Sequence, residues 1–196
     1  MTESPFHLSA ARPALPLRTE RLVLRPLTDA DVDAAHSFRG NPEVCTFLPF
    51  EPQSRELIRV RLAGIMGSTS LDSEHEAIIL GVERLADGRL IGDLVLFHYE
   101  AEHGSAEVGW VFHPDVAGQG YATEAVGALF AAAFGELGLR RLRARIDELN
   151  TASARLAERL GMRQEARLVE NEWFKGRWST ELDYAILDRE WAARRD

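Results

Sequence analysis

Apolar residues recur at intervals of three and four along one stretch in the second half of the chain. The stretch follows Gly118-Gln119-Gly120, and its apolar members are Ala122, Ala125, Val126, Leu129, Phe130, Ala133, Phe134 and Leu137. This spacing places them on one face of a helix. Before the glycines, Ala106–Phe112 has the pattern of a strand and is closed by His113-Pro114. The predicted order is therefore strand, glycine-rich turn and helix.

This order of elements predicts a binding site for a phosphate. Glycine has no Cβ, so the backbone at Gly118 and Gly120 can approach a ligand closely. The first turn of a helix has free N–H groups at the positive end of the helix dipole. The run lacks the Gly-Lys-Ser/Thr of a P-loop, and Thr123 stands where a dinucleotide fingerprint needs a third small residue. A helix that only needed a tight entry is the alternative interpretation.

A second junction of the same kind follows. Leu139–Asp147 alternates in polarity, which predicts a strand. Asn150 is a favourable N-cap for the next helix. One face of that helix carries Ser153, Leu156, Ala157 and Leu160. The helix is expected to end at Gly161, since glycine is common just after helix C-termini.

The remaining pattern predicts strands and helices in mixed order. Strands are expected at Glu20–Arg25, Ala77–Arg84, Leu90–Phe97, Glu165–Glu172 and Thr180–Leu187, and helices at Thr28–Phe38 and Ser54–Met66. Thr28 and Asp31 resemble a capping box, and Asp87-Gly88 is typical of a hairpin turn. Such a mixture predicts an α/β sandwich around one mixed sheet. We expect a single domain over residues 17–196, after a mobile N-terminal tail over residues 1–16.

Composition and charge narrow the class of protein. The chain has 196 residues, 45% of them hydrophobic, and a net charge of −8. No apolar run reaches the length of a membrane span, and the N-terminus does not resemble a signal peptide. We therefore expect a cytoplasmic protein with no membrane partner. The negative charge argues against broad nucleic-acid binding, so salt bridges explain the arginines Arg140, Arg141, Arg143 and Arg145 better than a nucleic-acid site does.

The cysteine and the histidines predict no metal site and no disulfide. Cys45 is the single cysteine, which fits a reducing compartment, and a small buried residue is a better interpretation of it than a nucleophile. His98, His103 and His113 lack the helical pairing with glutamate that a zinc site of this type requires.

Several motifs together resemble the GCN5-related N-acetyltransferases (GNAT). They are Gly118-x-Gly120-x-Ala122 after a strand, Asn150-x-x-Ser153 and Leu160-Gly161-Met162. Within this family, the sequence is most similar to the ribosomal-protein alanine acetyltransferase branch. The similar segments are Leu17–Leu27, Asn41–Val44, Gly109-Trp110, His113-Pro114, Gly118–Ala125 and Asn171–Trp178. The resemblance covers Leu17–Leu187. It implies a single central, mixed and mostly antiparallel sheet flanked by helices, acetyl-CoA as the co-substrate, and a primary amine as the acceptor. It also allows a homodimer.

The resemblance assigns cofactor binding to the end of the strand, the glycine-rich turn and the start of the second helix. The residues are Val111, Phe112, His113, Gly118, Gln119, Gly120, Tyr121, Ala122, Thr123, Asn150, Ser153 and Arg159. For Arg159, a solvated helix face is the alternative. The chain departs from the family at Asp115, where Gln or Arg is frequent. It departs again at Ala157, where many members carry a tyrosine that protonates the leaving thiolate.

Acetyl transfer to an amine needs a proton acceptor, because a free alkylamine has a pKa of about 10. Glu107 is the candidate, since it lies in an otherwise apolar strand, where its pKa is expected to be raised. It also matches the glutamate that precedes the Gly-aromatic pair in the family. A charge that reaches solvent or an arginine is the alternative. Glu172 and Glu170, beside Trp173-Phe174, are further candidates for the base or for holding a cationic substrate.

Ser153, on the first turn of the capped helix, is the candidate hydrogen-bond donor to the departing sulfur. A bond to its own backbone is the alternative. Trp173, Phe174 and Trp178 either line a substrate cleft or pack in a hairpin.

The predicted function is acyl-CoA-dependent acetylation of a primary amine, on a protein N-terminus or a small molecule, by direct transfer in a ternary complex. An acyl-CoA-binding module with little catalysis is an alternative because of Ala157. A longer acyl group such as succinyl and a dinucleotide-binding protein are further alternatives.

Overall fold

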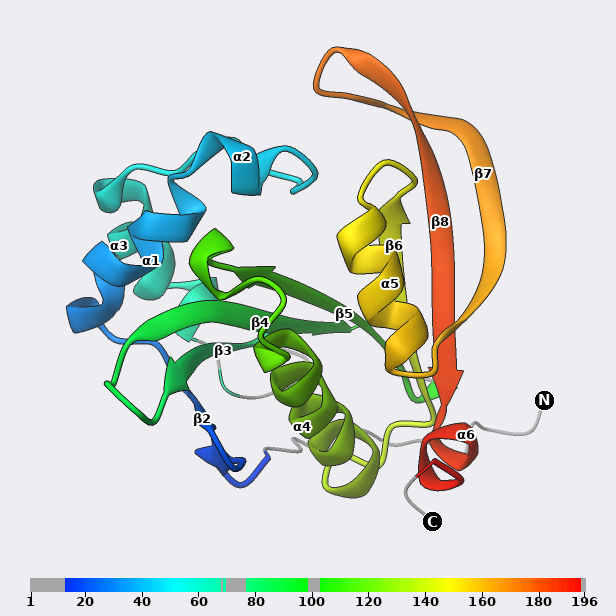
Figure 1. The fold of residues 1–196 in the computed structure, drawn as a ribbon, viewed down its shortest axis with the longest axis horizontal. Helices are drawn as coiled ribbons and strands as arrows, with labels where there is room; N and C mark the ends of the chain where they lie inside the picture. Colours follow the sequence, from blue (N-terminus) through cyan, green and yellow to red (C-terminus); the bar gives the residue numbers. More distant parts are fainter. Residues whose placement is uncertain (1–12, 68, 70–76, 99–102, 195–196) are drawn as a thin grey trace.

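The fold is built on one eight-stranded sheet (Figure 1). The computed structural model describes residues 13–67, 69, 77–98 and 103–194. The strands are β1 Leu17–Arg18, β2 Leu22–Arg25, β3 Ala77–Arg84, β4 Leu90–His98, β5 Ser105–Phe112, β6 Arg141–Asp147, β7 Arg163–Phe174 and β8 Arg177–Leu187. Their order is β1-β2-β3-β4-β5-β6-β8-β7, and only β5 and β6 pair in parallel. The predicted mixed, mostly antiparallel sheet is confirmed.

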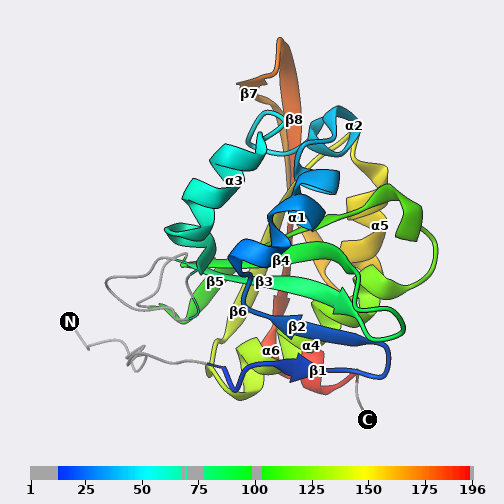
Figure 2. The same ribbon diagram turned by 90° about the vertical axis from the view of Figure 1, so that its left-hand side faces the viewer.

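Helices cover both faces of this sheet (Figures 1 and 2). They are α1 Val32–Arg39, α2 Pro42–Cys45, α3 Arg55–Leu62, α4 Tyr121–Gly135, α5 Thr151–Arg159 and α6 Asp188–Ala192, with 3-10 turns η1 Asp29–Asp31, η2 Ile65–Gly67 and η4 Pro114–Val116. Helices α4 and α5 pack on the main core, and α1 and α3 pack on a second, smaller core. On β3, Ile78 belongs to the main core and Ile79 to the second. Because neighbouring side chains of a strand point to opposite faces, the two cores lie on opposite sides of the sheet.

Strands β5 and β6 separate partway along their length. They pair only between Ser105–Glu107 and Arg141–Arg143. Beyond these residues β6 stays paired with β8, whereas β5 has no strand partner on this side in the described part of the chain. The edge of Gly109–Phe112 is therefore open, and backbone groups on it can bond a ligand.

Strands β7 and β8 form a long hairpin at one edge of the sheet (Figure 1). Its turn is Lys175-Gly176, with φ of +46° and +83°, the left-handed conformation of a two-residue hairpin turn. A bulge interrupts β7 between Leu168 and Glu172, and inside it Glu170 also has a positive φ of +50°. The hairpin is longer than predicted because the strands pair again beyond the bulge.

The ends of the first two helices differ from the prediction. The capping box of Thr28 and Asp31 is present, but a 3-10 turn follows it, so that α1 begins only at Val32. Ser54 caps α3 by accepting the Leu57 backbone N–H at 3.2 Å. This helix ends at Leu62 instead of Met66, and a separate 3-10 turn follows. The sequence pattern did not predict the short strand β1 or the short helices α2 and α6.

Most of the predicted N-terminal tail, residues 1–12, lies outside the described residues. In its remainder, the backbone N–H of Ala14 donates to Glu136 Oε2 at 2.6 Å. Leu15 packs against the main core. These two residues therefore contact the domain, and the mobility of the tail stays a prediction.

Candidate active site

The chain between β5 and α4 makes the predicted glycine-rich turn, called the glycine turn below (Gly118–Gly120). The φ angles of Gly118 and Gly120 are +74° and +80°, in the left-handed region that favours glycine. Gly120 is the N-cap of α4, and no described side chain caps the first N–H groups of this helix. These N–H groups lie at the positive end of the dipole of a 15-residue helix. The turn can therefore bind an anion such as a phosphate.

Glu124 anchors the start of α4 to the N-terminal strands. Its Oε1 accepts hydrogen bonds from Thr19 Oγ1 at 2.6 Å and from the Arg21 backbone N–H at 2.9 Å. Its Oε2 accepts one from Arg21 Nε at 2.6 Å. Burial acts to raise the pKa of Glu124, but the hydrogen bonds from Thr19 and Arg21 outweigh it and lower the pKa. Arg21 also donates to the Gln119 carbonyl at 3.0 Å and lies 4.5 Å from the centre of the Tyr121 ring, which puts a cation beside the glycine turn.

Arg159 reaches the same helix start from α5. Its Nη1 donates to Thr123 Oγ1 at 3.1 Å. The structure thus brings two of the predicted cofactor residues together. Arg21 was not among the predicted residues, although its position beside the turn adds a second guanidinium there.

Asp115 does not replace the missing Gln or Arg of the family. Its carboxylate pairs with Arg89 at 3.3 Å, and its backbone N–H donates to His113 Nδ1 at 3.2 Å. Gln119 closes the turn by donating to the Asp115 carbonyl at 2.9 Å. The side chains of His113 and Gln119 therefore shape the loop ahead of α4.

Asn150 and Ser153 lie at the start of α5. Asn150 Oδ1 accepts the Ser153 backbone N–H at 3.2 Å, which confirms the predicted cap. Ser153 Oγ accepts a hydrogen bond from Trp110 Nε1 of β5 at 3.1 Å. The indole fixes the hydroxyl and leaves the hydroxyl hydrogen available to donate. Ala157 is fully buried in the main core, so this position supplies no donor.

A cavity of about 410 Å³ lies over the open end of β5 and is called the acceptor cavity below. Its floor includes Gly109–Val111 of β5, and Asn150 and Ser153 also border it. One group of lining residues, the acidic wall, is Glu107, Asp147, Glu172 and Glu181. Another group, the apolar wall, is Phe47, Phe50, Ile65, Met66 and Phe97. The cavity therefore joins the start of α5 to a space with two chemically different sides.

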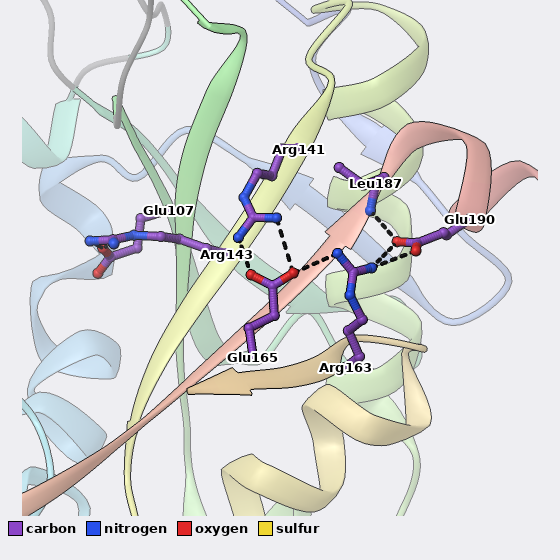
Figure 3. A network of polar contacts seen from close by, with 7 residues as sticks. All are labelled: Glu107, Arg141, Arg143, Arg163, Glu165, Leu187 and Glu190. Atoms are coloured by element: carbon purple, nitrogen blue, oxygen red, sulfur yellow. Dashed lines mark hydrogen bonds and ion pairs between the residues drawn. The ribbon is translucent and has the colours of Figure 1, made fainter. Parts of the chain in front are cut away.

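Glu107 is held by two arginines of β6 and is not surrounded by apolar residues. Arg143 Nη2 and Nε donate to Glu107 Oε2 at 2.8 and 3.0 Å, and Arg145 Nε lies 3.2 Å from the same oxygen. Figure 3 shows Glu107 and Arg143 side by side, coming from β5 and β6. The predicted apolar surroundings are wrong because they were inferred from one strand, whereas the neighbouring strand supplies the cations. The alternative of an arginine partner is confirmed.

Two further carboxylates of the acidic wall were not predicted. Asp147 Oδ2 accepts hydrogen bonds from Arg177 and Ser179, both at 2.5 Å. Glu181 has a weaker counter-ion, because Arg145 Nη1 lies 3.6 Å from its Oε2. Burial raises the pKa of the Glu181 carboxyl; Arg145 opposes this shift, and other carboxylates, including Glu172, add to it. Both residues pair across β6 and β8, a contact that the sequence pattern does not reveal.

Helix α1 and the tip of the β7–β8 hairpin hold the segment that contributes Phe50 to the cavity. Arg39 of α1 donates to the buried carboxylate of Asp93 at 2.6 and 2.7 Å and lies 5.1 Å from the centre of the Phe50 ring. Lys175, at the tip of the β7–β8 hairpin, donates to the carbonyls of Cys45 and Phe50 at 2.6 and 2.8 Å. The hairpin is thereby tied to the segment that carries Phe47 and Phe50 of the apolar wall.

The cysteine and the arginine cluster agree with their structural interpretations. Cys45 is buried, its Sγ lies 3.2 Å from the Arg39 carbonyl, and burial raises the pKa of its thiol. Arg141 pairs with Glu165, which also contacts Arg163, and Figure 3 shows this network extending to Glu190. Salt bridges therefore account for the arginines of β6.

The aromatic residues of the hairpin divide between the two interpretations. Phe174 lines the acceptor cavity. Trp173 and Trp178 instead pack edge to face with ring centres 5.4 Å apart, and both are mostly exposed. Glu170 lies in the bulge and is not part of the cavity lining.

Among the described residues, no group of three or more His, Cys, Asp and Glu side chains is arranged to hold a metal ion. No helix within this part of the chain is long and apolar enough to cross a membrane.

Comparison with known proteins identifies the family. Residues 21–163 match the model of the acetyltransferase (GNAT) domain. An uncharacterized N-acetyltransferase, YnaD of Bacillus subtilis (strain 168), is 30% identical over 175 residues, which cover 89% of this chain and 98% of YnaD. The chain belongs to the GNAT N-acetyltransferases, as the sequence motifs predict.

Solved structures agree with this assignment. A probable GNAT-family acetyltransferase from Chromobacterium violaceum ATCC 12472 superposes with a TM-score of 0.80 at 28% identity, covering 98% of this chain and 96% of the other. Spermidine N-acetyltransferase from Vibrio cholerae, solved with CoA and spermine, has a TM-score of 0.77 at 22% identity, with coverage of 89% and 99%. At that identity the second likeness concerns the fold alone.

Proposed function

We propose that this protein transfers the acetyl group of acetyl-CoA to a primary amine by direct attack in a ternary complex. The observation that carries the proposal is the connection between the anion site and the acceptor cavity. Gly109–Val111, which lines the cavity, leads through the end of β5 and the 3-10 turn η4 to the glycine turn. Ser153 borders the cavity from α5, whose Arg159 contacts the start of α4. A ligand with phosphates at one end and a thioester at the other matches this arrangement.

The backbone N–H groups from Gly118 to Thr123 would hold the pyrophosphate, with Arg159 and Arg21 adding positive charge. This cradle includes the predicted residues Tyr121 and Ala122, which supply the first N–H groups of α4. The pantetheine amides would bond the open edge of β5 at Val111, Phe112 and His113, and Asn150 from the other side. This part of the proposal is supported by the edge of β5 from Gly109 to Phe112, which pairs with no strand on the β6 side among the described residues.

Catalysis then requires deprotonation of the amine, attack on the thioester and departure of the thiolate. The acceptor ammonium gives a proton to the Glu107 carboxylate, and the neutral nitrogen attacks the thioester carbonyl carbon. The C–S bond breaks, and the Ser153 hydroxyl donates to the sulfur as it leaves. The proton lost by the new amide nitrogen completes the CoA thiol. Because two arginines already bind Glu107, the acceptor nitrogen must lie within hydrogen-bond reach of the Glu107 carboxylate for the proton to pass.

An acyl-CoA-binding module without useful catalysis is the second candidate. The buried Ala157 favours it, because the usual acid of the family is absent and Ser153 is not a strong acid. Two other predictions from the sequence, a homodimer and a cytoplasmic location, stay predictions.

The test combines calorimetry with a thiol-release assay. We expect saturable binding of acetyl-CoA, no binding of NAD, and release of CoA that depends on an added primary amine. Binding without amine-dependent release would favour the binding module. A faster reaction with succinyl-CoA than with acetyl-CoA would replace the acetyl donor by a longer one.

A further inference from the structure

The two walls of the acceptor cavity differ in charge as well as in polarity. The acidic wall has four carboxylates, and ion pairs with described residues give them three guanidinium partners, Arg143, Arg145 and Arg177. Glu172 forms no side-chain hydrogen bond or ion pair with any residue that the structure describes. Glu181 shares Arg145 with Glu107 at the longer distance of 3.6 Å. This wall therefore has one more carboxylate than guanidinium groups; the carboxylate without a partner among the described residues, Glu172, is exposed, and Arg145 lines the cavity beside Glu181.

The bulge of β7 contributes to this negative site. It places Glu172 opposite Ser179 and Leu168 opposite Glu181, and the Asn171 amide within the bulge lies 3.5 Å from Glu181 Oε1. Bulges re-aim side chains and are frequent beside active sites. Glu181 is largely buried, with 15% of its side chain exposed. A carboxylate with little water and a distant counter-ion gains by binding an ammonium group.

The apolar wall has the reverse character, and its Phe97 pairs directly with Glu107 across β4 and β5. Phe47, Phe50 and Phe97 supply aromatic surface. The charged residues on this side are Arg39, which is neutralised by Asp93, and Arg61, which lies 5.9 Å from the centre of the Phe50 ring. No residue in the described ranges forms an ion pair with Arg61. A second ammonium group on the acceptor would therefore meet a cation here instead of an anion.

Size and closure restrict the acceptor further. The volume of about 410 Å³ is within the usual range for small-molecule pockets, roughly 300–1,000 Å³. Lys175 ties the hairpin that carries Phe174 to the segment that carries Phe50. The two sides of the cavity are thus joined, which suits a compact body better than a polypeptide chain.

We infer that the acceptor is a small primary monoamine with an apolar, aromatic-sized body, whose ammonium group binds on the acidic wall at Glu107 and Glu181, the two carboxylates that share Arg145, and whose body packs against the apolar wall. This inference rests on the proposed function and names its substrate class. Polyamines are then poor acceptors because their second ammonium group meets the Arg61 cation. Peptide N-termini are poor acceptors because Lys175 joins the two sides of the cavity and leaves little room for a polypeptide chain.

The test compares acceptors on the wild-type enzyme with saturating acetyl-CoA. The panel is 2-phenylethylamine, propylamine, spermidine and a peptide with an N-terminal alanine. We expect kcat/KM for 2-phenylethylamine to exceed that of each other amine by about ten-fold or more, because the ring adds apolar burial and the other amines lose it or meet Arg61. Spermidine or the peptide as the best acceptor would overturn the inference and leave the proposed function standing.

Two variants test the assigned residues. Glu181→Gln is expected to raise KM for 2-phenylethylamine by about ten-fold with a smaller change in kcat, as expected for a lost ammonium contact. Glu148→Gln, an exposed carboxylate paired with Arg167 outside the cavity, is the matched control and should behave as wild type. Arg61→Glu should increase the spermidine to 2-phenylethylamine ratio of kcat/KM by about five-fold or more, because it supplies an anion to the second ammonium. An unchanged ratio in Arg61→Glu together with wild-type KM in Glu181→Gln would overturn the assignment.

Acetyl-CoA binding is measured on every variant, so that failure of the proposed function can be distinguished from failure of the inferred substrate class. If the wild type binds acetyl-CoA and no amine of the panel releases CoA, the proposed function fails and the inference fails with it. If release occurs but the preference is different, only the inference fails.

Discussion

The side of the site where acetyl-CoA is proposed to bind is called the donor side. Here the glycine turn and the first turn of α4 present backbone N–H groups. On the acceptor side, the cavity presents carboxylates and aromatic rings from strands and helices far apart in the sequence. A backbone cradle depends on a few φ angles and tolerates many side chains, whereas a side-chain cavity depends on each long-range pair. The donor side can therefore be shared by a whole family, while the acceptor side sets what each member acetylates.

The largest expected effect comes from breaking a buried pair on the acceptor side. Asp93→Ala leaves the Arg39 guanidinium buried without its anion, and breaking such a pair costs about 3–5 kcal/mol of unfolding free energy. Chemical denaturation of wild type and variant measures the loss. Asp33→Ala, which removes an exposed partner of Arg55, is the control and should change little.

If the two sides are independent, the folded fraction of Asp93→Ala should still bind acetyl-CoA with wild-type affinity. A parallel loss of acetyl-CoA affinity would show that the acceptor side supports the donor side, and the contrast between them would then be wrong.

The second effect concerns catalysis at Glu107. Glu107→Gln keeps the shape of the side chain and removes the proton acceptor, so we expect turnover to fall roughly 10²-fold with little change in acetyl-CoA affinity. The measurement is single-turnover acetylation of a good amine acceptor across a pH series. Glu165→Gln, whose carboxylate pairs with Arg141 and Arg163 on the same network outside the cavity, is the matched control. Turnover and a pH profile equal to wild type in Glu107→Gln would leave Glu107 as a structural partner of Arg143 and Arg145.

The sequence predicts the donor side well because its determinants are local. The strand before the glycine turn, the two glycines and the amphipathic helix lie within residues 106–137. The Asn150 cap acts on Ser153, three residues away. Each of these features follows from a spacing or a residue type that has one dominant structural explanation.

The acceptor side is poorly predicted because its contacts are long-range. Arg39 and Asp93 are 54 residues apart, Glu107 and Arg143 are 36 apart, and Lys175 and Cys45 are 130 apart. No periodicity of one segment reveals which charge on another segment will face it. This is why Glu107 was expected among apolar residues and why Glu181 was not expected in the site at all. The carboxylate of Asp147 was missed for the same reason.

A third, smaller effect tests the donor side alone. Gly120→Val places a branched side chain at a residue with φ of +80°, where a Cβ would also lie 3.4 Å from Arg21 Nη2. We expect acetyl-CoA affinity in calorimetry to fall about ten-fold or more, at least about 1.4 kcal/mol. Gly135→Val in the last turn of α4, where a Cβ would meet nothing within 4 Å, is the control for a general effect on the helix. Unchanged affinity in a folded Gly120→Val protein would move the phosphate site elsewhere.

The smallest effect follows from the anchor between Glu124 and the N-terminal strands, and it depends on pH. The hydrogen bonds from Thr19 and Arg21 lower the pKa of Glu124 in the folded state below its ordinary value of 4.5. A carboxyl group with a lowered folded-state pKa stabilises the fold above its unfolded-state pKa, and this contribution is lost as the pH falls through the folded-state pKa. Glu124→Gln should therefore lower the unfolding free energy by roughly 1 kcal/mol at pH 7, and the difference from wild type should shrink steadily below pH 4.5. Because the same side chain positions the start of α4, a modest loss of acetyl-CoA affinity should accompany the change at pH 7, with no change in the KM of the amine. A stability difference that is equal at pH 7 and pH 3 would mean that the charge of Glu124 does not hold the donor side in place.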